Sequence, residues 1–305
     1  MNAIPETQNT PRQLDRLAAQ RQLYSDGKRI LAAQIILSVP CVIILSFLVA
    51  AFPEVKTLKM VTATWGALLT MLDIAYFSNR VTALRERAAK VQELFDCDVL
   101  ELEWRDLKAG HRPDAEAIVQ SSFKYKCKDP ECASLRDWYP VGVGRLPLHL
   151  ARIICQRANC WWDAQLRRRY ADYVLAGLMV LAVFVLIIGF MGGLTLDKFF
   201  LAVVLPLMPA LVWSARQRKE HREIAAAIDR LKEHADKLWA KALSGKASPE
   251  ELTVESRNLQ DEIYDRRRRS PLIFDWIYKR LRRSHEEQMN QGAELMIEDA
   301  IKSLR

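Results

Sequence analysis

Four apolar segments interrupt an otherwise polar sequence. Residues 30–52 hold no charged side chain over 23 positions, and as a helix rising 1.5 Å per residue this segment is long enough to cross a hydrocarbon layer of about 30 Å. Further apolar segments occupy residues 60–78, 173–193 and 199–213. The last is short and contains two prolines, and it becomes a span only with its apolar neighbours up to residue 215. We therefore expect an all-α membrane protein with two transmembrane helical hairpins.

Basic residues flank all four apolar segments on one side. The short connectors 53–59 and 194–198 hold three lysines as their basic residues. The other ends of the apolar segments are flanked by clusters such as Arg167 to Arg169. The positive-inside rule then places both chain ends and the central segment in the cytoplasm. The expected division is a cytoplasmic segment 1–29, hairpins 30–78 and 173–215, a cytoplasmic helical segment 79–172, and a cytoplasmic helical hairpin with a C-terminal helix in 216–305.

Helical periodicity continues beyond the second and fourth apolar segments. Apolar residues recur at alternating spacings of three and four, a pattern that packs one helix on another. They are Val81, Leu84, Ala88, Val91 and Phe95 in one seam and Ile224, Ile228, Leu231, Ala235, Leu238 and Ala242 in the other. Each hairpin is thus expected to extend into the cytoplasm as one long helix. Ser248, Pro249 and Glu251 then form a helix-start signal, and a return helix carrying Leu252, Ser256, Leu259 and Ile263 is expected to follow.

Composition narrows the classes of function. The chain of 305 residues is half hydrophobic and carries a net charge of +8, which excludes a disordered chain and a small disulfide scaffold. Its five histidines are scattered, and its sequence contains neither HExxH nor a glycine-rich phosphate loop. We therefore expect no enzyme, no catalytic residue and no cofactor. The pairs Cys127/Cys132 and Cys155/Cys160 have a spacing that zinc sites use, but buried reduced thiols are the favoured interpretation, so no metal is expected.

Residues 136–170 are the most distinctive part of the sequence. DWYP at 137–140 is followed by CQRAN at 155–159, WWD at 161–163 and LRRRY at 166–170. QRQLYSDGKRI at 20–30 leads into the first apolar segment. In these motifs and in its layout the sequence resembles the bacterial SMODS-associating four-transmembrane effector family. The resemblance implies a role in anti-phage defence beside enzymes that make a nucleotide signal, with the membrane protein as the killing component that breaches the inner membrane.

Two interpretations of residues 136–170 remain open. In the first, arginine forks that suit phosphates and aromatic rings that suit bases form a receptor for a cyclic oligonucleotide. Its candidate ligand-binding residues are Arg152, Gln156, Arg157, Asn159, Trp138 and Tyr139. One of the two arginines is expected to contact ligand, and the other to pack or to pair with an acid such as Asp163. In the second, favoured interpretation, Trp161, Trp162, Tyr170 and Tyr173 anchor a helix at the membrane surface. The basic runs 266–269 and 280–283 are expected to be solvated faces against anionic lipid or phosphate.

Asp73 is the charged residue well inside an apolar segment, so it is a candidate pore or gate residue. The alternative is that it pairs with Arg29 or Arg80. Gly189 and Gly193 form a GxxxG motif that permits close helix packing and complete the candidate pore set.

Four helices in one subunit would fill their own centre, so a pore implies a homo-oligomer. The expected function is a pore-forming or membrane-disrupting effector that responds to a nucleotide signal or a partner. The expected partners are the lipid bilayer, further copies of the chain and a cyclic oligonucleotide ligand, with no nucleic acid polymer. A non-pore receptor or scaffold is the alternative, and an ion transporter is the weakest because selectivity needs more polar groups in the membrane.

Overall fold

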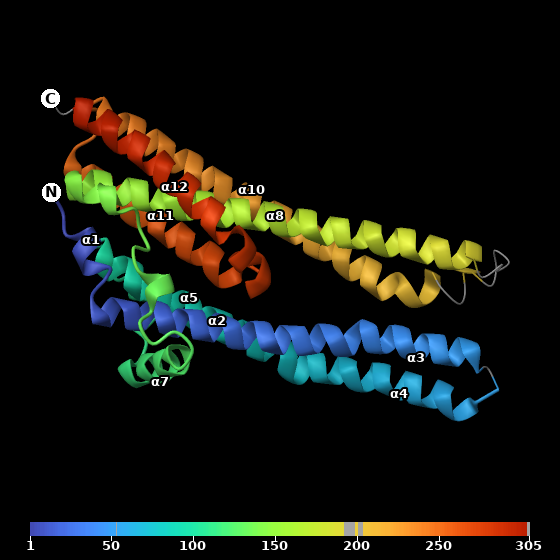
Figure 1. Cartoon of the computed structure of the whole chain (residues 1–305). Helices are drawn as coiled ribbons and strands as arrows, with labels where there is room; N and C mark the ends of the chain where they lie inside the picture. The colour runs from blue at the N-terminus through green and yellow to red at the C-terminus, as the bar shows by residue number, and fades with distance from the viewer. Residues whose placement is uncertain (53, 192–198, 201–203, 304–305) are drawn as a thin grey trace. The chain divides into compact units, whose positions relative to one another are not determined.

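The computed structural model describes residues 1–52, 54–191, 199–200 and 204–303, and all regular elements in this part of the chain are helices (Figure 1). The prediction of an all-α protein is confirmed for these residues. The long helices are α2 (Pro11–Ser38), α3 (Pro40–Ala51), α4 (Lys56–Leu72), α5 (Ser78–Val99), α7 (Ala115–Lys126), α8 (Leu148–Met191), α10 (Leu205–Leu243), α11 (Pro249–Arg269) and α12 (Asp275–Ser303). The short ones are α1 (Ile4–Thr7), a π-helix η1 (Asp73–Phe77), α6 (Asp106–Ala109), and the 3-10 helices η2 (Ala133–Leu135) and η3 (Val141–Arg145).

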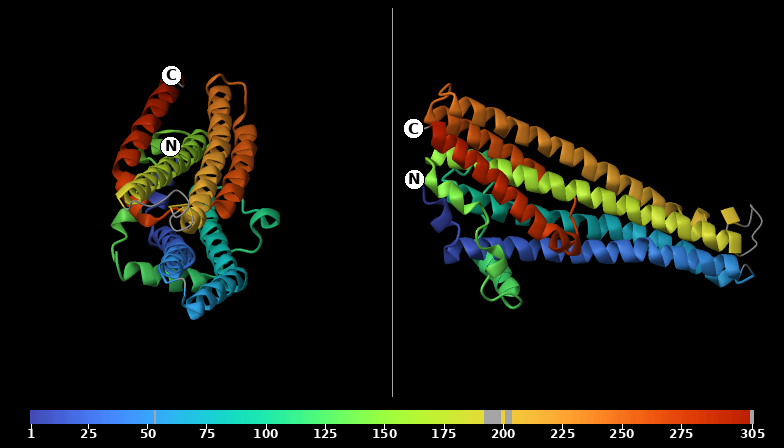
Figure 2. Two further views of the ribbon diagram at one scale, coloured as in Figure 1. Left: turned by 90° about the vertical axis from the view of Figure 1, so that its right-hand side faces the viewer. Right: turned by 45° about the horizontal axis from the view of Figure 1, so that its top comes forward.

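The chain divides into two compact units. Unit 1 consists of Met1–Asp26, Leu84–Arg167 and Glu223–Arg305, and unit 2 consists of Gly27–Ala83 and Arg168–Arg222. Unit 2 contains both predicted hairpins, 30–78 and 173–215. The divisions fall inside α2, α5, α8 and α10, so each of these helices contributes residues to both units. Figure 2 shows the long helices from two further sides.

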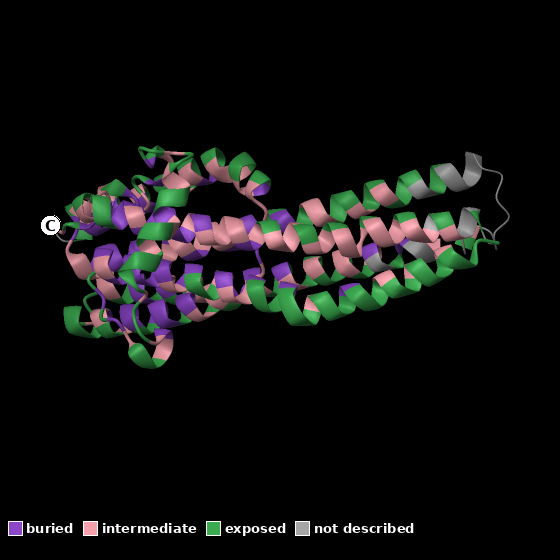
Figure 3. Cartoon of the chain, turned by 90° about the horizontal axis from the view of Figure 1, so that it is seen from below, coloured by how far each residue is buried: buried purple, intermediate pink, exposed green. Residues whose placement is uncertain are grey.

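Unit 1 is built on a conventional apolar core, visible as buried residues in Figure 3. All five positions of the predicted seam in α5 are buried, from Val81 to Phe95. In α10, Ile228, Ala235 and Leu238 are buried, and the other three seam positions are half-buried against the same core. Both predicted seams are thus confirmed, and they pack against helices of the same chain.

The turn between α10 and α11 also follows the predicted signal. Gly245 ends α10 with a positive φ of 65°, a conformation that glycine adopts without a side-chain clash. The Ser248 hydroxyl accepts a hydrogen bond from the Glu251 backbone N–H at 3.2 Å, and the Glu251 carboxylate accepts one from the Ser248 N–H at 2.9 Å. This capping box starts α11 at Pro249, and all four predicted positions of the return helix are buried.

Unit 2 exposes its apolar surface. Pro11–Ser46 and Lys56–Val99 are long and apolar enough to cross a membrane, and only 0% and 11% of their most apolar windows are buried. A helix in the core of a soluble protein would be mostly buried. The Trp65 indole N–H donates to the carbonyl of Leu37 at 3.4 Å, so the first two predicted spans contact each other. The third and fourth predicted spans fall partly on residues 192–198 and 201–203, which lie outside the described residues.

Two irregularities depart from the predicted uninterrupted helices. The first predicted span, 30–52, is broken at Val39, because Pro40 lacks the N–H that a continuous helix needs and instead begins α3. The second span changes from α-helix to π-helix over Asp73–Phe77. Short π segments inside α-helices frequently mark functional positions. Here the segment begins at the candidate gate residue.

Candidate functional site

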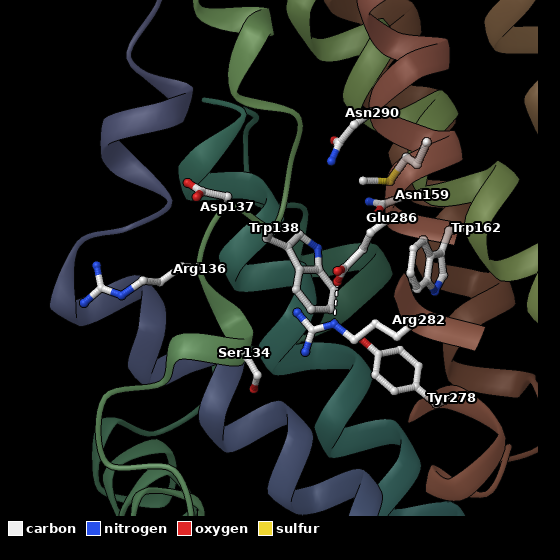
Figure 4. A pocket seen from close by; sticks show the side chains of 11 residues that line it. Ser134, Arg136, Asp137, Trp138, Asn159, Trp162, Tyr278, Arg282, Glu286 and Asn290 are labelled. Carbon is white, nitrogen blue, oxygen red and sulfur yellow. Dashed lines mark hydrogen bonds and ion pairs between the residues drawn. The ribbon is translucent and has the colours of Figure 1, made fainter. Parts of the chain in front are cut away.

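A pocket of about 190 Å³ in unit 1 collects aromatic and polar side chains from three elements (Figure 4). The rings of Trp138, Trp162 and Tyr278 contribute its aromatic surface, and Arg282 and Glu286 lie beside them. The full lining is Ser134, Arg136, Asp137, Trp138, Asn159, Trp162, Tyr278, Arg282, Glu286, Met289 and Asn290. We call this set the aromatic pocket.

The chain's N-terminal segment holds Trp138 in place. Asp137 has a φ of 51°, a left-handed conformation in which Asn9 holds it. The Asn9 amide donates to the Asp137 carboxylate at 2.8 Å and accepts from the Asp137 N–H at 3.0 Å. One residue beyond Trp138, Gln8 makes a similar pair of bonds with the backbone of Tyr139, at 2.7 and 3.2 Å. Residues 8 and 9 therefore fix the backbone on both sides of the tryptophan.

Helical spacing supplies the other walls of the pocket. Asn159 and Trp162 are three residues apart on α8, and Tyr278, Arg282, Glu286 and Asn290 recur every fourth residue on α12. Residues at these spacings share one face of a helix. The buried His285 packs edge-on against Trp162, with ring centroids 5.4 Å apart, and the Trp162 and Tyr278 rings are 6.1 Å apart.

The polar groups of the pocket suit an anionic aromatic ligand. Arg282 donates to the Glu286 carboxylate at 2.5 Å, and although burial lowers the pKa of Arg282, this hydrogen bond leaves that pKa above its usual value, so the guanidinium stays charged. The Arg21 guanidinium lies over the Tyr278 ring at 3.8 Å, a cation–π distance. The indole N–H of Trp138 is buried and has no hydrogen-bond partner among the described residues.

The structure separates the six predicted ligand-binding residues. Trp138 and Asn159 line the aromatic pocket, and Tyr139 lies behind it, fully buried, donating to Asp96 at 2.7 Å and accepting from Asn159 at 3.1 Å. Burial raises the pKa of Tyr139 well above its usual value. Gln156 is fully buried and donates to the Ser256 carbonyl at 2.7 Å. The six residues therefore do not form one site.

The two arginines have the structural partners that the sequence left open. Arg152 donates to the carbonyls of Leu100 and Glu101 at 2.6 and 2.7 Å, just beyond the end of α5, where a cation stabilises the helix terminus. Arg157 forms an ion pair with Asp236. Arg157 thus pairs with an acid, as expected for one of the two arginines, but this acid is Asp236 and not Asp163, which binds Arg167 at 3.0 Å.

A second cavity of about 280 Å³ lies on the Arg157 side of α8. Its lining includes Arg157, Trp161, Lys232 and two methionines. Both cations bind the carboxylate of Asp236, Lys232 at 2.7 Å. This cavity therefore offers a single aromatic ring, Trp161, where the aromatic pocket offers three.

A buried cluster of charges connects α5 and α11 next to Tyr139. Arg257 donates to Glu93 at 2.7 Å, and Arg267 donates to Asp96 at 2.8 Å. Burial and the neighbouring Asp96 raise the pKa of Glu93. The expectation that residues 266–269 form a solvated face is wrong for Arg267, whose side chain is 13% exposed. In the sequence, this cluster is indicated only by Asp96, an acid that stands between the apolar residues Phe95 and Cys97, both of which are buried in the structure.

The candidate pore residues lie in unit 2. Asp73 accepts a hydrogen bond from Gln34 at 2.5 Å, so its partner in the structure is an amide on α2 and not Arg29 or Arg80, the partners that the alternative interpretation named. Gly189 belongs to α8, and Gly193 lies outside the described residues.

The cysteines outside unit 2 are mostly inaccessible. Cys97, Cys132, Cys155 and Cys160 are buried and Cys127 is exposed, and no disulfide joins any of these. Burial raises the pKa of Cys160 to about 12, which keeps this thiol protonated at neutral pH.

Comparison with known proteins gives two matches. The sequence model of a family described as the SMODS-associating 4TM effector domain matches residues 2–296. A probable CBASS effector molecule of Bacillus cereus (strain VD146) is 27% identical over 292 residues, which cover 94% of this chain and 95% of the relative. No solved structure matches the chain.

Proposed function

The chain belongs to the SMODS-associating 4TM effector family, and from this premise we propose that it breaches the bacterial inner membrane when a nucleotide second messenger binds the aromatic pocket. Family and relative indicate an effector of CBASS anti-phage defence. We add three proposals to this role: the membrane breach, a nucleotide ligand, and the aromatic pocket as its binding site.

The observation that carries the proposal is the convergence of three aromatic rings with arginine in the aromatic pocket. A base stacked on an aromatic ring gains about 1–3 kcal/mol, and a guanidinium fork matches the oxygens of a phosphate. The cavity is smaller than the roughly 300–1,000 Å³ that encloses a drug-sized ligand. It therefore fits a single base with its phosphate better than a whole cyclic oligonucleotide, whose remainder would lie outside it.

The effector step is assigned to unit 2. Its apolar, outward-facing helices suit a bilayer, and two candidate transmembrane helices together with the four-transmembrane family indicate membrane localisation. We propose that both chain ends and residues 79–172 face the cytoplasm, that copies of the chain assemble, and that Asp73 lies along the path of the breach. Because α2, α5, α8 and α10 each contribute to both units, a shift of these helices on ligand binding would reach unit 2 through the backbone.

Calorimetry on the full-length protein in lipid nanodiscs tests the pocket, with a panel of cyclic di- and trinucleotides as ligands. Arg282→Ala should weaken binding about ten- to a hundredfold, because it removes charge-assisted hydrogen bonds worth about 1.5–3 kcal/mol. Arg283→Ala is the matched control, since Arg283 makes the same i,i+4 ion pair with Glu287 but is 93% exposed and outside the pocket.

A second pair of variants tests stacking. Trp162→Ala should weaken binding about five- to a hundredfold, whereas Trp161→Ala should not, although both rings contact His285. Normal binding by Arg282→Ala and Trp162→Ala, with thermal melts showing folded protein, would remove the pocket from the proposal.

A potential-sensitive dye in cells carrying the activated system tests the breach. Asp73→Asn and Gly189→Leu should reduce depolarisation while membrane insertion is retained, and Thr70→Val, which removes a hydroxyl bonded to its own helix at 2.9 Å, should not. An absence of depolarisation by the wild type would favour a non-pore scaffold.

A further inference from the structure

One face of α12 presents a tryptophan and three basic residues to solvent. Trp276 is 59% exposed, and Lys279, Arg280 and Arg283 are also exposed. At 100° per residue these four positions fall within an arc of about 100°, so they form one stripe along the helix. No acidic residue occurs between positions 276 and 284. We call this set the Trp276 face.

The positive charge of the Trp276 face is available to a partner. Lys279 and Arg280 have no ion pair among the described residues, and Arg283 is 93% exposed even though it lies 3.2 Å from Glu287. Two further exposed arginines, Arg266 and Arg269, lie at the end of α11, only a few residues before α12 begins. The aromatic pocket uses the opposite side of the same helix, through Tyr278 and Arg282.

Three contacts tie the start of α12 to residues that directly precede apolar segments. Asp275 accepts a hydrogen bond from Ser25 at 3.2 Å, and Tyr278 lies under Arg21. The carbonyl of Pro271 accepts a hydrogen bond from Arg167 at 3.1 Å. Ser25 precedes the predicted span at residue 30 by five residues of α2, and Arg167 precedes the one at 173 by six residues of α8, or roughly 8–9 Å along either helix. Proteins place tryptophan and basic residues at this level of a membrane.

We propose that the Trp276 face binds the anionic phospholipid headgroups of the bilayer in which the chain is embedded. Trp276 supplies the ring that prefers the interface, and Lys279, Arg280 and Arg283 supply the positive charge that complements phosphatidylglycerol. Each basic residue near an anionic surface strengthens the attraction about fivefold. The inference rests on the membrane location of the chain and is independent of the nucleotide site.

Fluorescence quenching by brominated lipids tests the proposal on the full-length chain in nanodiscs. Discs contain either phosphatidylcholine alone or a mixture with phosphatidylglycerol, with the bromine on one lipid at a time. The quenching of Trp276 is the difference between the wild type and Trp276→Phe, which removes the contribution of the other tryptophans. The basic residues are tested by Lys279→Gln/Arg280→Gln/Arg283→Gln.

A matched control removes the same charge elsewhere. Lys237, Lys241 and Lys246 are exposed residues at the far end of α10 and in the following turn, without an ion pair in the described structure. Their triple replacement by Gln changes the net charge of the protein by the same amount.

Trp276 should be quenched at least about twofold more by brominated phosphatidylglycerol than by brominated phosphatidylcholine, and salt should reduce this preference. The triple variant of the Trp276 face should lose the preference, and the α10 control should keep it. Equal quenching by the two lipids, or the same loss in both triple variants, would overturn the proposal. So would a loss of single-stranded DNA binding in the first triple variant with unchanged lipid quenching, because that result would assign the face to a nucleic acid.

Discussion

Arg267→Ala should destabilise unit 1 far more than the same change one residue earlier. The Asp96 carboxylate is fully buried and accepts hydrogen bonds from Tyr139 at 2.7 Å, Gln260 at 3.0 Å and Arg267 at 2.8 Å. Arg267 is the cation bound to this carboxylate. Its removal leaves a buried charge without compensation, and breaking a buried pair in this way costs about 3–5 kcal/mol.

The neighbouring Arg266 is the matched control, because it is exposed and makes no ion pair within the described residues. Arg266→Ala should change stability by no more than about 0.5 kcal/mol. Thermal unfolding of the full-length protein in detergent micelles measures both variants. At about 2–3 °C per kcal/mol for a chain of this size, Arg267→Ala should lower Tm by roughly 6–15 °C, and Arg266→Ala by about 1.5 °C or less.

A double variant separates lost charge pairing from lost packing. Adding Asp96→Asn to Arg267→Ala removes the uncompensated carboxylate, so the double variant should be more stable than Arg267→Ala alone. Hydrogen exchange should show the loosening of Arg267→Ala in α5 and α11, which carry the two partners. Equal Tm values for the Arg266 and Arg267 variants, or no recovery in the double variant, would refute the account of this cluster.

Three further predictions concern the capping box, the loss of stability at low pH, and the membrane topology. Ser248→Ala should cost about 1 kcal/mol in thermal melts because it removes the cap of α11, and an unchanged Tm would mean that packing alone starts this helix. Burial raises the pKa of Asp236, but the bonds from Lys232 and Arg157 outweigh burial and hold this pKa below its usual value. Its stabilising effect should therefore be full above about pH 4 and be lost as the pH falls further, so Asp236→Asn, unlike Glu233→Gln, should flatten the plot of Tm against pH in that range. A reporter inserted near Gly110 should be cytoplasmic and one near Val55 periplasmic; periplasmic activity at Gly110 would contradict the four-span arrangement.

The sequence by itself determined the features that depend on neighbouring residues. Apolar length marked the candidate spans, a spacing of three and four residues marked the buried seams of α5 and α10, and the Ser248–Glu251 signal marked the start of α11. These features are local, because a helix repeats every 3.6 residues and its cap depends on the first turn. The family motifs across 136–170 were also legible, and the family is confirmed.

The tertiary structure decided which polar residues face inward. Arg152 and Gln156 read as a ligand-binding face of α8, yet α11 packs against that face and supplies partners such as Thr253 and Ser256. Arg266 and Arg267 are adjacent in one basic run, but successive side chains of a helix point in different directions. Arg266 is therefore exposed, and Arg267 lies against the buried Asp96. The aromatic pocket joins Trp138, Trp162 and Tyr278 across 140 residues of chain. Residues so far apart meet only through the packing of whole helices, which is set by the sum of many apolar contacts and by no local pattern.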